Sequence, residues 1–123
     1  MKQMQLELLD QATAAIATPL YAGLQERKAP SLRFTYRVTP DGSVSAPDYW
    51  FKSDNSETEV KDYPSDAVHE AVVEAARAHW RLTQDLGLPR WYKLIMSVQR
   101  GGKFSVDFEY KDDYKEGDMM RQL

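Results

Sequence analysis

Apolar residues recur at helical spacing in two parts of this 123-residue chain. Residues 3–17 combine good helix formers with an apolar stripe at a spacing of three to four residues: Met4, Leu8, Ala12, Ala15 and Ile16. The stripe is followed by Thr18-Pro19, where the proline can either kink the helix or start a second one over 19–27. The pattern predicts the first helix and leaves the second part open.

A longer helix is predicted over residues 65–86. Ser65 can cap its N terminus, Asp66 suits the positive end of the helix dipole, and Gly87 follows its last residue. Its apolar stripe keeps a 4-3-4-3-4 spacing: Val68, Val72, Ala75, His79, Leu82 and Leu86. We therefore expect one face of this helix to pack on the core.

Alternation of apolar and polar residues predicts strands before the long helix. Residues 32–38 alternate in this way, and a shorter strand is expected at Asp48–Lys52. The acidic segment Ser53–Asp62 is expected to be a loop. The consecutive aromatic residues 49–51 cannot all face inward on a strand, so at least one of them should be exposed or lie under a loop.

Two further strands, 91–99 and 103–110, flank the turn Arg100–Gly102. A two-residue loop would pair a core residue with a solvent-facing one, whereas a three-residue loop pairs Val98 with Phe104 and keeps apolar side chains on one face. We therefore expect the three-residue loop, with Gly102 in a left-handed conformation.

The order of these elements predicts an α+β fold. We expect a single domain over residues 1–123, with an antiparallel four-stranded sheet, two main helices packed on one face, and the order α-β-β-α-β-β. The other face of the sheet should be open to solvent. The residues expected to be buried are Val72, Leu82, Leu94, Met96, Phe104, Val106 and Phe108.

Composition excludes several classes of site. The chain has no cysteine, which rules out disulfides, thiolate metal sites and a cysteine nucleophile. His79 is read as a residue at the edge of the core, and His69 lies about 15 Å away along the helix axis, too far to share a metal ion with it. We expect no metal and no cofactor. The absence of a membrane-spanning or signal-peptide pattern predicts a cytoplasmic protein.

Acidic residues gather in two short segments. Residues 48–66 hold two basic and six acidic residues, a net charge of −4, and residues 107–118 have the same balance. A net charge of −3 for the whole chain disfavours binding to nucleic acid. Two acidic segments instead favour a basic protein partner.

Asp107 and Glu109 are the strongest candidates for catalysis. They are two residues apart on a predicted strand, so their side chains share a face with Cα atoms about 7 Å apart. This spacing suits a two-carboxylate hydrolase or a site for a hard cation. No histidine or glycine-rich loop joins them, and an exposed acidic stripe used for docking is the favoured interpretation.

Residues 91–113 resemble the YezG-like immunity (antitoxin) family. The resemblance rests on a tryptophan that opens a strand, a turn closing in Gly-Lys-Phe, and an acidic strand end: Trp91, Gly102, Lys103, Phe104, Asp107, Phe108, Tyr110, Asp112 and Asp113. It implies a small cytoplasmic protein, not an enzyme, that binds and neutralises a cognate toxin domain, commonly a nuclease. The segment before the first strand looks shorter than is usual in that family.

The expected partner is therefore a nuclease-like toxin domain, bound by a monomer in a 1:1 complex without nucleic acid or membrane. The expected contact residues are Asp107, Glu109, Asp112, Asp113, Glu116 and Asp118, with Trp50, Asp54, Glu57, Glu59 and Asp62 as a second set. Two alternatives remain: an adaptor or scaffold module with the same fold, and a small hydrolase that uses Asp107 and Glu109.

Overall fold

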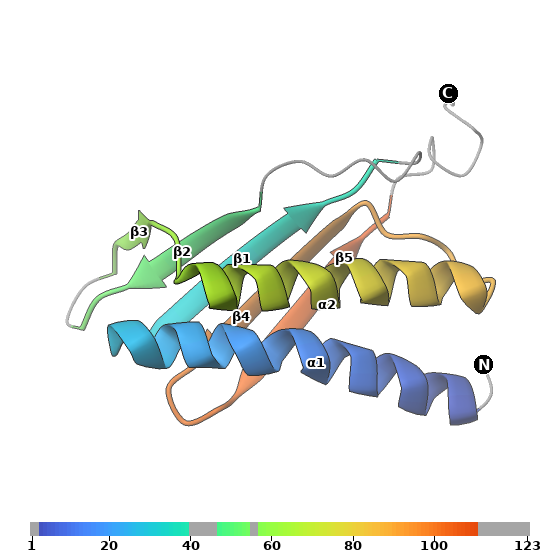
Figure 1. The fold of residues 1–123 in the computed structure, drawn as a ribbon, viewed down its shortest axis with the longest axis horizontal. Helices are drawn as coiled ribbons and strands as arrows, with labels where there is room; N and C mark the ends of the chain where they lie inside the picture. The colour runs from blue at the N-terminus through green and yellow to red at the C-terminus, as the bar shows by residue number, and fades with distance from the viewer. Residues whose placement is uncertain (1–2, 40–46, 55–56, 111–123) are drawn as a thin grey trace.

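Two helices cover one face of a five-stranded antiparallel sheet in the computed structural model, which describes residues 3–39, 47–54 and 57–110 (Figure 1). The elements follow one another as α1 Gln3–Arg27, β1 Ser31–Arg37, β2 Asp48–Lys52, β3 Glu59–Lys61, α2 Asp66–Asp85, β4 Lys93–Gln99 and β5 Phe104–Glu109. The sheet order is β3-β2-β1-β4-β5, and every neighbouring pair is antiparallel. The α+β class and the helices on one face are confirmed.

The predicted number of strands was wrong. The segment Ser53–Asp62, expected to be a loop, contains the short strand β3, so the sheet has five strands rather than four. Val60 lies opposite Phe51 in this pairing, while Glu59 and Lys61 face the other side of the sheet. The alternation is present in the sequence, but it spans three residues and includes one apolar side chain, which is too little to predict a strand.

Helix α1 is continuous through Pro19. Proline cannot donate a hydrogen bond to the carbonyl group of Ala15, four residues earlier, but Ala15 is exposed and water can satisfy that carbonyl. The buried residues of α1 all lie in its C-terminal half: Ile16, Ala17, Leu20, Gly23 and Leu24. The predicted stripe was therefore wrong at Met4, Leu8 and Ala15, which are exposed.

Helix α2 agrees with the prediction within one residue at each end. The Ser65 side chain accepts a hydrogen bond from the backbone N–H of Val68 at 3.4 Å, as a cap should. Gly23 of α1 allows close packing of the two helices, since a Cβ atom there would lie 3.1 Å from a methyl group of Val68. Leu82, expected in the core, is only half-buried, because Thr83 faces inward instead.

The hairpin of β4 and β5 has the predicted register. Val98 lies opposite Phe104, and the loop Arg100–Gly102 includes two glycines with φ of 98° and 96°. Phe104, however, is 43 % exposed rather than buried. Val106 and Phe108 are half-buried, since β5 is an edge strand and the helices bury the side chains of the inner strands most completely.

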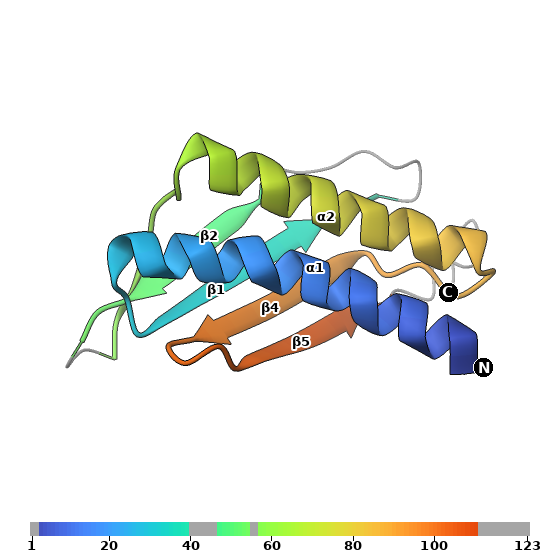
Figure 2. The same cartoon turned by 60° about the horizontal axis from the view of Figure 1, so that its bottom comes forward.

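The N-terminal half of α1 extends beyond the end of β5, and the two helices lie side by side on the sheet (Figure 2). The core between sheet and helices is built around large side chains, among them Phe34, Tyr36, Tyr49 and Trp91. In the part of the chain that the structure describes, no helix has the length and apolar character needed to cross a membrane.

Candidate functional site

The face of the sheet opposite the helices, here called the open face, carries Trp50 on β2, the strand next to the edge strand β3. Tyr49 and Phe51 are buried beneath the helices, so alternation turns Trp50 to the open face, where it is half-buried. Arg33 lies beside it on β1 and Lys61 beside it on β3. The guanidinium carbon of Arg33 is 5.1 Å from the centre of the indole ring, and the Lys61 ammonium is 5.7 Å from it.

Two carboxylates hold these cations in place. Arg33 donates from Nη2 to Glu59 Oε1 at 2.8 Å and from Nε to both carboxylate oxygens at 3.3 Å. Lys61 pairs with Asp48 at 3.0 Å. We call these five residues the open-face patch: Arg33, Asp48, Trp50, Glu59 and Lys61. Each cation of the patch is paired with a carboxylate, so the patch is electrically neutral, with an aromatic ring at its centre.

The remaining predicted acidic residues of this region also face cations. Asp62 pairs with Arg27 of α1, and the hydrogen bond from that guanidinium, with a second from the N–H of Tyr63, lowers the pKa of the Asp62 carboxyl. Asp54 pairs with Arg100 at 3.2 Å, and Glu57 with Lys52 at 3.5 Å. The local charge is therefore close to neutral, although the sequence segment is acidic.

Asp107 and Glu109 share the open face of β5, as the strand alternation predicted. Asp107 is exposed and lies opposite Ile95. Glu109 is half-buried and its Oε1 atom accepts a hydrogen bond from the Tyr92 hydroxyl at 2.7 Å. The predicted residues Asp112, Asp113, Glu116 and Asp118 lie outside the described residues.

The two acidic sets lie at opposite edges of the sheet. Glu59 belongs to β3 and Asp107 to β5, with three strands between them. Four inter-strand spacings separate these edges by about 19 Å. The structure therefore brings Trp50 together with Glu59, and it separates both from Asp107 and Glu109.

Both histidines are engaged in packing. The indole N–H of Trp91 donates to Nδ1 of His79 at 3.2 Å, and Nε2 of His79 lies 3.2 Å from the Thr13 hydroxyl. Burial lowers the pKa of His79, which keeps its ring neutral. His69 hydrogen-bonds the Tyr49 hydroxyl at 2.9 Å. Among residues 3–39, 47–54 and 57–110, no three His, Cys, Asp or Glu side chains form a group that could hold a metal ion.

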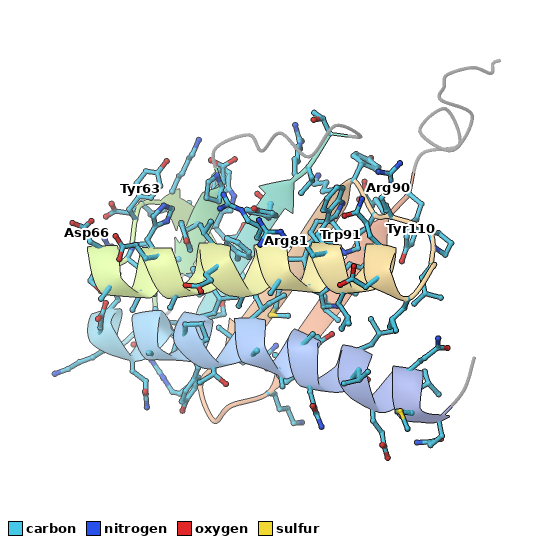
Figure 3. The ribbon with its side chains drawn as sticks, turned by 45° about the vertical axis from the view of Figure 1, so that its right-hand side comes forward. Tyr63, Asp66, Arg81, Arg90, Trp91 and Tyr110 are labelled. Carbon is cyan, nitrogen blue, oxygen red and sulfur yellow. The ribbon has the colours of Figure 1, made fainter. Side chains whose placement is uncertain are left out.

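An apolar groove of about 560 Å³ lies between the N-terminal half of α1, the end of α2 and β5. Its apolar walls come from Leu6, Leu9, Leu88, Phe104, Val106, Phe108 and Tyr110. Figure 3 shows Tyr110 at the same end of α2 as Trp91 and Arg90, far from Tyr63. Sequence reasoning missed this groove. The one available signal was leucine at positions 6, 8 and 9, which makes α1 apolar on more than one side.

A scan against protein-family models and a search of curated proteins found no match to this chain.

Proposed function

We propose that this chain is a protein-binding module that acts as an immunity protein, neutralising a toxin domain by direct contact. The observation that carries the proposal is the open-face patch, where Trp50 lies between Arg33 and Lys61. Tryptophan and arginine contribute most of the binding energy at many protein interfaces. The ion pairs that hold Arg33 and Lys61 reduce the entropy lost when a partner binds.

The choice of a toxin as partner rests on the resemblance of residues 91–113 to YezG-like immunity proteins. Within this stretch, Trp91 packs in the core, Gly102 adopts the positive φ of the turn, and Asp107 lies on the open face. The first two positions support the fold that the resemblance implies. The third is accessible to a partner.

Acidic residues provide the electrostatic part of the proposed contact. Nuclease domains carry cationic substrate clefts, and complementary charge speeds association more than it changes the final affinity. Asp107 and Glu109 at the β5 edge supply this charge, together with the acidic residues that follow them in sequence: Asp112, Asp113, Glu116 and Asp118. The open-face patch supplies the apolar and aromatic anchor.

Protection of growing cells tests this function. Each reading frame that flanks this gene is expressed in bacteria with and without the chain, and growth is followed. Survival that depends on the chain supports an immunity protein. If the chain binds several unrelated proteins and gives no protection, it is an adaptor module instead.

The hydrolase alternative has one supporting observation, the shared face of Asp107 and Glu109. We expect Asp107→Asn combined with Glu109→Gln to leave the fold nearly unchanged, because Asp107 is exposed and glutamine keeps an oxygen that can accept the Tyr92 hydrogen bond. The measurement is hydrolysis of nucleotide, phosphoester and glycoside substrates by both purified proteins. Turnover in the wild type that the double variant lacks would favour an enzyme.

A further inference from the structure

Strand β5 presents its backbone at one edge of the sheet that the described strands form. Among the described strands, β5 pairs with β4 alone. The carbonyl oxygens of Lys103 and Glu109 accept hydrogen bonds from the β4 side, at 2.8 and 2.9 Å. Because backbone groups alternate in direction along an antiparallel strand, the N–H and C=O groups of the even-numbered residues 104, 106 and 108 point outward.

The two edge strands of the sheet, β3 and β5, differ in how readily an additional strand could pair with them. Strand β3 has three residues, and short edge strands give little surface for another strand to pair with. Strand β5 has six residues and lacks proline. It is therefore the better template for an additional strand.

Exposed apolar side chains gather beside this edge. Phe104 is 43 % exposed and Tyr110 is 49 % exposed, and both line the apolar groove. Leu6 of α1, also 43 % exposed, lies across the groove from them. An apolar surface of this kind at a free strand edge is typical of a protein interface.

The sequence of β5 complements itself when two copies pair in antiparallel orientation. A two-fold axis through Val106 places Val106 opposite its own copy and Phe104 opposite Phe108, all on the groove side. On the open face, Ser105 then lies opposite Asp107, and Lys103 lies opposite Glu109 of the second copy. Residues directly opposite in an antiparallel pair share a face, so apolar meets apolar and cation meets carboxylate.

The neighbouring symmetric registers are less favourable. Centring the axis on Asp107 places two carboxylates directly opposite each other, which is destabilising. Centring it on Ser105 places Phe108 opposite Gly102 and loses the aromatic pairs. Register selection therefore favours the arrangement centred on Val106.

We propose that this chain forms a symmetric homodimer by antiparallel pairing of β5 with β5 of a second copy, centred on Val106. The dimer has a continuous ten-stranded sheet and departs from the monomer expected from sequence. It covers the edge beside the groove and leaves the open-face patch, near the opposite edge, accessible. The proposal does not depend on the toxin partner, since the purified chain alone tests it.

A charge-swap experiment tests the register. Sedimentation velocity is measured for wild type, Lys103→Glu, Glu109→Lys and an equimolar mixture of the two variants. In a dimer of either variant, both pairs of positions 103 and 109 carry like charges. We therefore expect the dissociation constant of its dimer to rise about tenfold or more. The mixture restores both attractive pairs and should recover the dimer.

The mixture also controls for changes within one copy. Glu109→Lys removes the hydrogen bond from Tyr92, but this loss is present both alone and in the mixture. Wild type that stays monomeric at the highest attainable concentration overturns the proposal. A wild-type dimer that neither variant weakens, or whose loss the mixture does not reverse, also overturns it and indicates another interface.

A proline substitution tests the edge independently. Val106→Pro removes an N–H that points away from β4, so the pairing within one copy is kept while pairing between copies is blocked. The matched control is Lys61→Pro at the other edge. The N–H of the next residue, Asp62, donates inward to the Tyr49 carbonyl, so the N–H of Lys61 points outward and its loss leaves the pairing of β3 with β2 intact. We expect a folded monomer from the first variant and an unchanged dimer from the second. A dimer that persists in folded Val106→Pro contradicts the proposal.

Discussion

His79 links three parts of the fold through its two ring nitrogens. The Trp91 indole can only donate, so Nδ1 of His79 must be unprotonated and Nε2 must carry the proton. Nε2 then donates to the Thr13 hydroxyl, which in turn donates to the Leu9 carbonyl at 2.8 Å. The network joins α2 to α1 and to the segment before β4. The network requires a neutral imidazole, because a protonated His79 would place its own Nδ1–H against the indole N–H of Trp91.

This arrangement predicts a loss of stability in mild acid. The pKa of His79 is lower in the folded protein than in the unfolded chain, where it is about 6.5, so the unfolded chain takes up the proton first. Stability is therefore complete above the unfolded pKa and falls as the pH drops through it. The free energy of unfolding in urea, measured for wild type and His79→Gln between about pH 7.5 and about pH 5.5, should decline less in the variant. Equal declines would contradict the assignment.

Tyr36 carries a buried polar atom whose role differs from that of His79. Its side chain is 1 % exposed, and its hydroxyl has no hydrogen-bond partner among the described residues. Removing an unsatisfied buried hydroxyl costs no hydrogen bond and relieves its desolvation. Tyr36→Phe should therefore leave the free energy of unfolding unchanged or raise it by up to about 1 kcal/mol. A clear loss of stability in denaturant titrations would mean that the hydroxyl is bonded.

At the level of elements, the sequence pattern predicted the features that depend on residues close together in the chain. Helix α2 has a cap, a stripe and a terminal glycine, and its bounds agree with the prediction. The β4–β5 register followed from side-chain parity around Gly101-Gly102. Strand β3 and the exposed half of α1 could not be predicted in this way, because both depend on neighbours distant in sequence: β3 on its pairing with β2, and α1 on where the sheet ends beneath it.

Strand β5 gives a contrast between two phenylalanines on one face. Phe108 stacks on His79 with ring centres 4.9 Å apart and also contacts Trp91, whereas Phe104 is 43 % exposed. Phe108→Ala should lower the free energy of unfolding by about 2–3 kcal/mol. This loss is at or below the lower end of the range usual for removing a buried phenylalanine ring, because Phe108 is half-buried. Phe104→Ala should cost less than about 1 kcal/mol in the monomer. Equal losses of unfolding free energy in the two variants would contradict the difference in burial between Phe104 and Phe108.

At the level of the whole molecule, sequence charge and spatial charge differ. Residues 48–62 are acidic as a segment, but cations from other elements lie against them: Arg27 from α1, Arg33 from β1 and Arg100 from the β4–β5 turn. The outward position of one aromatic residue and the shared face of Asp107 and Glu109 were predictable from strand parity. The pairing of Arg33 with Trp50 and Glu59 was not, because it depends on the sheet order.

The proposed binding role of the open-face patch is tested most directly with one matched pair of variants. Trp50→Ala removes the ring at the centre of the patch. Val60→Ala is the control, since Val60 is 52 % exposed on the adjacent strand but faces the opposite side of the sheet. Interferometry measures the dissociation constant of each variant for the toxin domain that the protection experiment identifies.

We expect Trp50→Ala to weaken this binding by about 2 kcal/mol or more, roughly thirtyfold, mainly through faster dissociation. Val60→Ala should bind as the wild type does. If Trp50→Ala binds as tightly as the control while both variants remain folded, the open-face patch is not the toxin-binding surface.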